Sequence, residues 1–258
     1  GESLPVKPKT MKRTVFSLAF LCLLLSQTAF AQENSVYIGA NGGFNLSKFK
    51  FTEDLSELYP TTSSRLGING GFVAGAVIQN WTISTGVQYI QKGGVYETNN
   101  FQTELGTGYF TAKERGHYIS VPILFGYRHP LGDNVAVSFA MGPSLNFGMK
   151  GTLNETIEYF GSDQIDIQNY NVAFGDGVNE DFRPTQVGFQ LSPGVVVNVG
   201  ERAKLNFNVT WDVGTADIFN PRYKDANSFF DTYTGNQLNR STLFTVGYEY
   251  HFSFGDKY

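Results

Sequence analysis

The feature of this sequence that most constrains its fold is a regular alternation of apolar and polar residues over 241–254. Because successive side chains of a β-strand point to opposite faces, this stretch has one apolar face and one largely polar face. The apolar face ends in Tyr248, Tyr250, Phe252 and Phe254, and such aromatic rows are typical of a membrane–water interface. We therefore expect a strand with one face in lipid, which closes a barrel against the first strand.

Seven earlier segments alternate in the same way. They cover 36–49, 65–79, 81–97, 117–128, 135–150, 186–199 and 204–215. The connections between segments are alternately long and short, and the long ones are 50–64, 98–116, 151–185 and 216–240. An even strand number with this alternation is typical of a transmembrane barrel with short periplasmic turns and long extracellular loops. The sequence thus predicts one all-β domain over residues 32–258, a closed eight-stranded antiparallel up-and-down transmembrane β-barrel.

Residues 11–31 have the parts of a secretory signal peptide. A basic pair precedes an apolar run over 15–25, and small residues precede a cleavage site after Ala31. The run is shorter than the ~20 apolar residues of a transmembrane helix. We expect export, cleavage near Ala31 and a location in the bacterial outer membrane, with residues 1–10 upstream of the natural start. The single cysteine, Cys22, would leave with the signal, so no disulfide is expected.

Loss of this leader makes the chain acidic. It removes four of 19 basic residues and one of 23 acidic residues, which leaves a net charge of −7. Binding to nucleic acid needs clustered Lys and Arg, so we expect no partner of that class. The expected partners are lipid and lipopolysaccharide of the outer membrane and a protein that contacts loops 151–185 and 216–240. We expect a monomer.

The two faces of the strands carry different candidate residues. The polar side chains expected to point into the lumen are Gln88, Lys92, Arg128, Lys204, Asp212 and Glu249. The aromatic side chains expected in a lipid-facing belt are Trp81, Tyr89, Trp211, Tyr248, Tyr250 and Phe252. Eight strands leave an interior just wide enough for side chains, so we expect a plug of hydrogen bonds and ion pairs rather than a conducting pore.

The sequence contains no strong signal for catalysis or metal binding. His117, His129 and His251 lie on separate segments without the spacing of metal ligands. Asp212 and His251 could face the lumen together in a hydrolase, but no serine stands in a Gly-x-Ser-x-Gly setting. We therefore expect no enzyme, no cofactor and no metal.

The long loops combine acidic and aromatic residues. Segment 174–181 could offer oxygens to calcium, but it lacks the spaced Asp-x-Asp-x-Asp-Gly pattern, so a solvated acidic loop is favoured. Aromatic residues between 159 and 174 and between 223 and 233 suit contact with a protein or a glycan. They could equally pack the loops against each other, which is the interpretation we favour.

Several short motifs occur in a characteristic order along the strands. They are Tyr89-Ile-Gln-Lys-Gly93, Tyr118-Ile-Ser-Val-Pro122, Met141-Gly-Pro143, Gly188 and Val246-Gly-Tyr248. In these motifs the chain resembles the PorT-like (porin-family) outer-membrane β-barrel domain of Gram-negative bacteria. The resemblance implies an outer-membrane barrel, and one member type assists secretion of proteins across the outer membrane. Gly86 and Gln186 stand where that family has Glu and Asp, so the resemblance does not predict an interior ion-pair network.

The preferred hypothesis is a non-enzymatic outer-membrane barrel that stabilises the envelope or presents its loops to a partner, such as a secretion component. One alternative is a soluble lipocalin-like barrel, whose apolar face would point inward around a small apolar ligand. A second alternative is a narrow channel for small solutes. The direction in which the apolar faces point discriminates the membrane barrel from the lipocalin-like one.

Overall fold

Strands make up most of the described chain. The computed structural model describes residues 34–103, 106–227, 229 and 234–254, so the expected signal peptide over 11–31 and the upstream residues 1–10 lie outside the described residues. The strands are β1 (Ser35–Phe51), β2 (Thr61–Ile78), β3 (Trp81–Thr103), β4 (Gly106–Pro130), β5 (Val135–Tyr159), β6 (Ile165–Val172), β7 (Thr185–Asn198), β8 (Ala203–Gly214) and β9 (Gln237–Ser253). Two short helices, α2 (Asp54–Leu58) and α3 (Pro221–Ala226), lie in the connections between them.

Eight of these strands close into a ring. In the described residues the sheet order is β4-β3-β2-β1-β9-β8-β7-β5-β6, and β4 also pairs with β5. All neighbours are antiparallel, and β1 pairs with β9 from Ser35↔Ser253 to Phe51↔Gln237. The predicted eight-stranded up-and-down barrel, closed by its first and last strands, is therefore confirmed.

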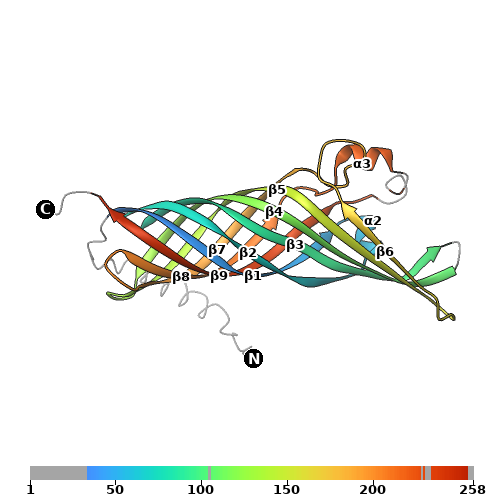
Figure 1. The fold of residues 1–258 in the computed structure, drawn as a ribbon, viewed down its shortest axis with the longest axis horizontal. Coiled ribbons are helices and arrows are strands. Elements are labelled where there is room, and N and C mark those ends of the chain that lie inside the picture. Colours follow the sequence, from blue (N-terminus) through green and yellow to red (C-terminus); the bar gives the residue numbers. More distant parts are fainter. Residues whose placement is uncertain (1–33, 104–105, 228, 230–233, 255–258) are drawn as a thin grey trace, which may run out of the picture. The chain divides into compact units, whose positions relative to one another are not determined.

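The two ends of the ring differ. At the turn end lie the short connections 79–80, 131–134 and 199–202 together with Ser35 and Ser253. Gln79 has a φ of 56°, the left-handed conformation that tight hairpin turns require. At the loop end lie the long connections with α2, α3 and β6 (Figure 1). No helix in the described part of the chain is both long and apolar enough to cross a membrane.

Two expected loops are largely strand. β3 and β4 continue as a hairpin through most of 98–116, and β5 continues to Tyr159 and pairs there with β6. The predicted loop boundaries at 98–116 and 151–185 are therefore wrong. The reason is that alternation persists in these extensions but changes its sense, with apolar residues inward and polar residues outward.

β1 shows this change most clearly. Its outward residues are in order Val36, Ile38, Ala40, Gly42, Phe44, Leu46, Lys48 and Lys50, and its inward ones are Ser35, Tyr37, Gly39, Asn41, Gly43, Asn45, Ser47, Phe49 and Phe51. In β5 the change coincides with a register shift, where His117 of β4 pairs with Lys150 and Tyr118 with Gly148. This bulge inserts one residue and so exchanges the two faces.

Towards the turn end, the outward surface is a continuous apolar belt. Phe72 is 74 % exposed and Trp81 is 66 % exposed, and neighbouring strands add further exposed Phe, Ile, Leu and Val side chains. A soluble lipocalin-like barrel needs the opposite arrangement, with its apolar face inside, so that alternative does not fit this part of the barrel.

The main apolar core of the described residues lies inside the loop-end extension. Its buried members are Phe49, Phe51, Leu55, Tyr96, Phe110, Ala112, Ile157, Tyr159, Val172, Phe182 and Ile218. Burying one phenylalanine side chain contributes roughly 2 kcal/mol. This core fixes α2 and residues 215–220 to the extensions. Of the loop aromatic residues for which packing was favoured, Tyr159 lies in this core, Phe160 and Tyr170 are exposed, and 230 and 233 lie outside the described residues.

Candidate functional site

A turn-end network of charged and polar side chains crosses the lumen. Arg128 Nη2 of β4 donates to Glu249 Oε1 of β9 at 2.9 Å, and Asn206 Nδ2 donates to the same oxygen at 2.9 Å. The other oxygen, Oε2, lies 3.0 Å from His251 Nε2, and His251 Nδ1 lies 2.9 Å from Ser35 Oγ. Arg128, Glu249 and His251 are all buried. The network therefore fills the lumen near the turn end.

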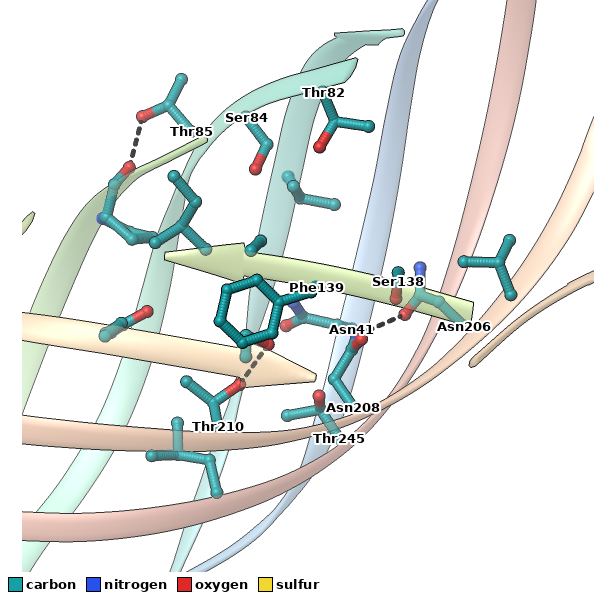
Figure 2. A pocket seen from close by; sticks show the side chains of 18 of the residues that line it. Asn41, Thr82, Ser84, Thr85, Ser138, Phe139, Asn206, Asn208, Thr210 and Thr245 are labelled. Atoms are coloured by element: carbon teal, nitrogen blue, oxygen red, sulfur yellow. Dashed lines mark hydrogen bonds between the residues drawn. The ribbon is translucent and has the colours of Figure 1, made fainter. Parts of the chain in front are cut away.

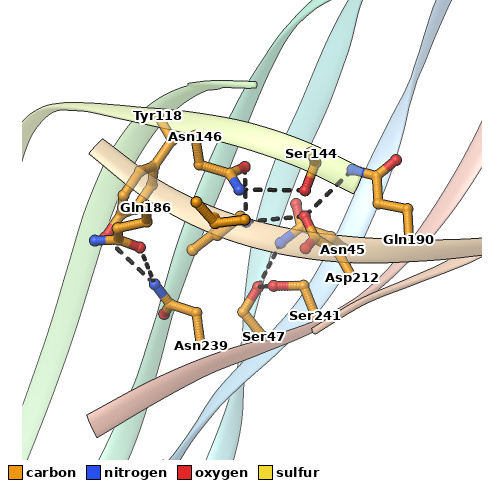
Figure 3. Close-up of polar contacts among 12 residues, drawn as sticks. Asn45, Ser47, Tyr118, Ser144, Asn146, Gln186, Gln190, Asp212, Asn239 and Ser241 are labelled. Carbon is orange, nitrogen blue, oxygen red and sulfur yellow. Dashed lines mark hydrogen bonds and ion pairs between the residues drawn. The ribbon is translucent and has the colours of Figure 1, made fainter. Parts of the chain in front are cut away.

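A loop-side network crosses the lumen farther along (Figure 3). Lys92 Nζ of β3 donates to Asp212 Oδ2 of β8 at 2.9 Å and to Asn146 Oδ1 at 3.0 Å, and Gln190 Nε2 donates to Asp212 at 3.3 Å. A Cβ at Gly188 would lie 2.9 Å from Asp212 Oδ1. Glycine at this position therefore leaves room for the buried carboxylate.

Between the two networks lies a small polar cavity of about 100 Å³ (Figure 2). Its polar lining comes from small hydroxyl and amide side chains on several strands. They include Asn41, Thr82, Ser84, Gln88, Ser138, Ser192, Asn206, Asn208, Thr210 and Thr245. Such a cavity has room for a few water molecules and is far smaller than the pocket of a drug-sized ligand.

The cross-lumen contacts join strands that lie directly opposite each other. In the ring of eight, β4 is four places from β9, and β3 is four places from β8. β4 and β9 are joined at a third level, where Gln237 Nε2 donates to Glu114 Oε2 at 3.0 Å. Burial raises the pKa of Glu114 to about 8. Side chains thus bridge the whole diameter of the barrel at three levels.

The structure places the sequence-predicted lumen residues on the inward face. Arg128, Asp212 and Glu249 are buried in the two networks. Gln88 lines the polar cavity, and Lys204 is half-buried and pairs in register with Glu249.

The residues expected in the belt all lie on the outward face, with different exposures. The exposed ones are Trp81, Trp211, Tyr248 and Phe252. The half-buried Tyr89 has its hydroxyl 2.5 Å from His117 Nδ1, and the half-buried Tyr250 packs edge-on against Phe252 with ring centroids 5.0 Å apart.

The structure separates the two residues considered for a hydrolase. Asp212 pairs in register with Ser241, ten residues from His251 along β9, a spacing of roughly 33 Å in a β-strand. The sequence pattern could not exclude their contact, because both residues belong to inward faces of neighbouring strands. Among the described residues, no group of three or more His, Cys, Asp or Glu side chains is arranged to hold a metal ion.

Two groups of the acidic loop that could offer oxygens to calcium contact other parts of the chain. Asp181 Oδ2 accepts from the backbone N–H of Ala173 at 2.9 Å, and the backbone oxygen of Asp176 accepts from Arg222 at 3.0 Å. The loop is packed against the segment that follows β8.

A basic rim lies on β1, β9, β4 and β5, where the apolar belt ends towards the loop end. Its outward-facing members are Lys48, Lys50, Lys113, Arg115, Lys150 and Arg240. Lys48 and Arg240 are partners in the β1–β9 register, and Lys150 is paired with His117. Sequence reasoning missed this rim, because it assigned several of these residues to loops.

An aromatic pocket of about 630 Å³ opens at the loop end above Glu114 and Gln237. Its rings are Phe51, Tyr59, Tyr96, Phe101, Phe110, Tyr159, Phe219, Tyr223 and Phe229. Its charged lining residues are Glu155 and Asp166. Burial raises the pKa of Glu155. The sequence signal that could have revealed the pocket is the run of apolar residues on inward positions beyond the membrane belt.

A family model described as an outer membrane protein beta-barrel domain matches residues 30–220. The chain belongs to this family. As an outer-membrane β-barrel domain protein, it is located in the bacterial outer membrane.

Solved structures of other outer-membrane proteins resemble this β-barrel domain. Neisserial surface protein A is 16 % identical, with a TM-score of 0.43 over 86 % of this chain and 100 % of that chain. A major outer membrane protein from Thermus thermophilus is 15 % identical, with a TM-score of 0.40 over 86 % and 100 %. Ail of Yersinia pestis is 8 % identical, with a TM-score of 0.36 over 85 % and 100 %. No curated protein matches the chain significantly. The assignment rests on the family match and the strand topology.

Proposed function

We propose that this protein is a closed, non-enzymatic barrel that conducts no solute and acts through its loop end, which faces the outside of the cell. The observation that carries the proposal is the set of contacts between opposite strands. Lys92–Asp212 and Arg128–Glu249 bridge the lumen at separate levels, and the cavity between them is about 100 Å³. A conducting pore needs a continuous water path, which these buried side chains block.

The basic rim supports this orientation. The outer leaflet of the outer membrane contains lipopolysaccharide, whose phosphates are anionic, and clustered Lys and Arg beside an apolar belt attract anionic headgroups. Lys48 and Lys50 emerge directly above Leu46 on β1, at the border of the belt. The rim therefore suits lipopolysaccharide as the lipid partner at the loop end.

A protein partner at the loop end is the second part of the proposal. The β5–β6 hairpin projects Phe160, Ile165, Ile167 and Tyr170 into solvent, each of them exposed. Exposed apolar and aromatic side chains on a rigid hairpin suit a protein contact. The PorT-like motifs suggest a role accessory to protein secretion.

Conductance across a planar lipid bilayer tests the closed lumen. The wild-type protein is expected to show no steady conductance, whereas a chain with Lys92, Arg128, Asp212 and Glu249 all changed to Ala is expected to conduct small ions. Steady conductance by the wild-type protein would contradict the proposal and favour the small-solute channel. A chain with Lys50, Lys113, Glu158 and Asp163 changed to Ala, all outside the lumen, is the matched control.

Co-purification from cells tests the partner. Replacing residues 154–169 by an Asn-Gly turn removes the β5–β6 tip together with the β4–β5 pairs of 108–113 with 154–159, and it leaves the other pairs of the ring. We expect wild-type protein to retain secretion components that the shortened chain loses. If both chains recover equal amounts of the secretion components, the β5–β6 hairpin is not the contact surface.

A further inference from the structure

The aromatic pocket is separate from the closed lumen. Its floor is Gln237, whose amide donates to the buried Glu114, and the polar networks lie below that contact. Its walls come from β1, α2, β3, β4, β5 and β6 on one side and from Phe219, Tyr223, Asn227 and Phe229 on the other. The polar networks block the lumen without this pocket, so closure of the lumen does not explain a cavity at the loop end.

The pocket has the size and lining of a site for a small organic molecule. Its volume of about 630 Å³ lies inside the roughly 300–1,000 Å³ of ligand sites. The Tyr96 ring meets the rings of Phe51 and Tyr59 edge-on, at 5.2 Å and 4.8 Å between centroids. Phe101 and Phe110 are stacked at 4.6 Å. The rings therefore stand at different angles around the space.

The charged residues of the pocket indicate the sign of the charge that its ligand carries. Glu155 and Asp166 line it, and no Lys, Arg or His is among the described residues that do so. Aromatic faces and carboxylates both attract a cation, and a cage of several rings is a preferred setting for an ammonium group. An anion would meet these two carboxylates, and Lys224, whose ammonium lies over the Phe219 ring, is already paired with Asp217.

We infer that the aromatic pocket binds a small organic cation, an amine or quaternary ammonium group joined to an aromatic or branched apolar body. The apolar body lies among Phe51, Tyr96 and Phe110, and the cationic group lies towards Glu155 and Asp166 on β5 and β6. The ligand reaches the pocket from the loop end.

Calorimetric titration of the full chain in lipid nanodiscs tests this inference, with empty nanodiscs as the blank. The probes are three compounds of similar shape: benzyltrimethylammonium, neutral neopentylbenzene and anionic phenylacetate. We expect saturable binding of the cation, weaker binding of the neutral compound and no binding of the anion.

Two pairs of variants separate the pocket from the rest of the protein. Glu155→Gln removes one of the two carboxylates that line the pocket, and Glu158→Gln removes a charge on the opposite, exposed face of β5. Loss of a charge-assisted contact weakens binding by about tenfold, so only Glu155→Gln is expected to reduce affinity for the cation. Gln168→Trp narrows the pocket and is expected to abolish binding, whereas Asn169→Trp, on the other face of β6, is the control.

Two outcomes would overturn the inference. The first is affinity that does not depend on the charge of the probe or on Glu155, and the second is no saturable binding of the cation by a folded, heat-modifiable barrel. The test is independent of the proposed closed lumen, because a conducting barrel could still bind the cation and a closed barrel could fail to bind it.

Discussion

Lys92 Nζ lies 2.9 Å from Asp212 Oδ2, and the two residues sit on strands directly opposite each other in the ring of eight. Both side chains are almost completely buried. A buried ion pair is costly to desolvate and contributes little net stability, but the loss of one partner leaves an unpaired charge. The main effect of the pair is therefore to specify the contact between β3 and β8 across the lumen, and its net contribution to stability is small.

Removal of one member of this pair is expected to destabilise the barrel strongly. Asp212→Ala leaves the Lys92 ammonium buried without its carboxylate and should lower the free energy of unfolding by about 3–5 kcal/mol. Lys92→Met with Asp212→Leu removes both charges and should be close to neutral. Urea unfolding in lipid vesicles measures both values. If the single and double variants lose equal stability, the charges are not coupled as the structure indicates.

A charge on the outward belt is expected to destabilise the barrel in lipid. Val195 and Phe207 are register partners on β7 and β8, and both are exposed on the outward face. Val195→Arg or Phe207→Arg should cost about 2–4 kcal/mol near the bilayer midplane. Asn154→Arg, on the outward face of the loop-end extension, should change stability by less than about 0.5 kcal/mol. Equal effects at the three positions would contradict the assigned membrane belt.

Glu114 is expected to make the stability of the loop end depend on pH. Burial raises its pKa from 4.5 to about 8, with Asp181 acting in the same direction and Gln237 and Arg65 in the opposite one. Between these pH values the folded state keeps a proton that the unfolded state has released, so stability falls as pH rises. The slope for one proton is about 1.4 kcal/mol per pH unit.

Glu114→Gln tests this dependence, because an amide cannot ionise and can still accept from Gln237. The variant should gain stability relative to wild type as pH rises from 5 to 8, as measured by urea unfolding. The stability of Glu158→Gln, a change at an exposed position, should depend on pH in the same way as that of the wild type. Parallel profiles for Glu114→Gln as well would mean that Glu114 is already ionised at low pH.

The basic rim is expected to contribute to lipopolysaccharide binding. Lys48→Glu with Arg240→Glu reverses two register partners, and each cation near an anionic surface is worth about 1 kcal/mol. Binding to immobilised lipopolysaccharide micelles should therefore weaken and become less dependent on salt. Arg202→Glu, in a connection at the turn end, is the control and should bind like wild type. If the rim variant keeps full affinity for lipopolysaccharide, the rim does not contribute to lipid binding.

The alternation of residue types was enough to predict the barrel. A period of two and alternating connection lengths are local properties of the chain, so they identified the eight ring strands and predicted inward positions for Arg128, Asp212 and Glu249. The predicted boundaries failed in the loop-end extensions, as in β5 after the bulge at Gly148, where the alternation changes sense. In the extensions the apolar residues point inward instead of outward. This reversal looks like the end of a strand if the apolar face of a strand is assumed to point outward along its whole length.

Sequence alone determined that this chain would form a closed antiparallel barrel with an apolar and a polar face. Only the tertiary structure decided which side chains meet, because contacts such as Arg128–Glu249 and Glu114–Gln237 depend on strand order, register and barrel diameter. The aromatic pocket has the same origin. Phe51, Phe110 and Phe229 are far apart in the chain, and closure of the ring brings them around one space.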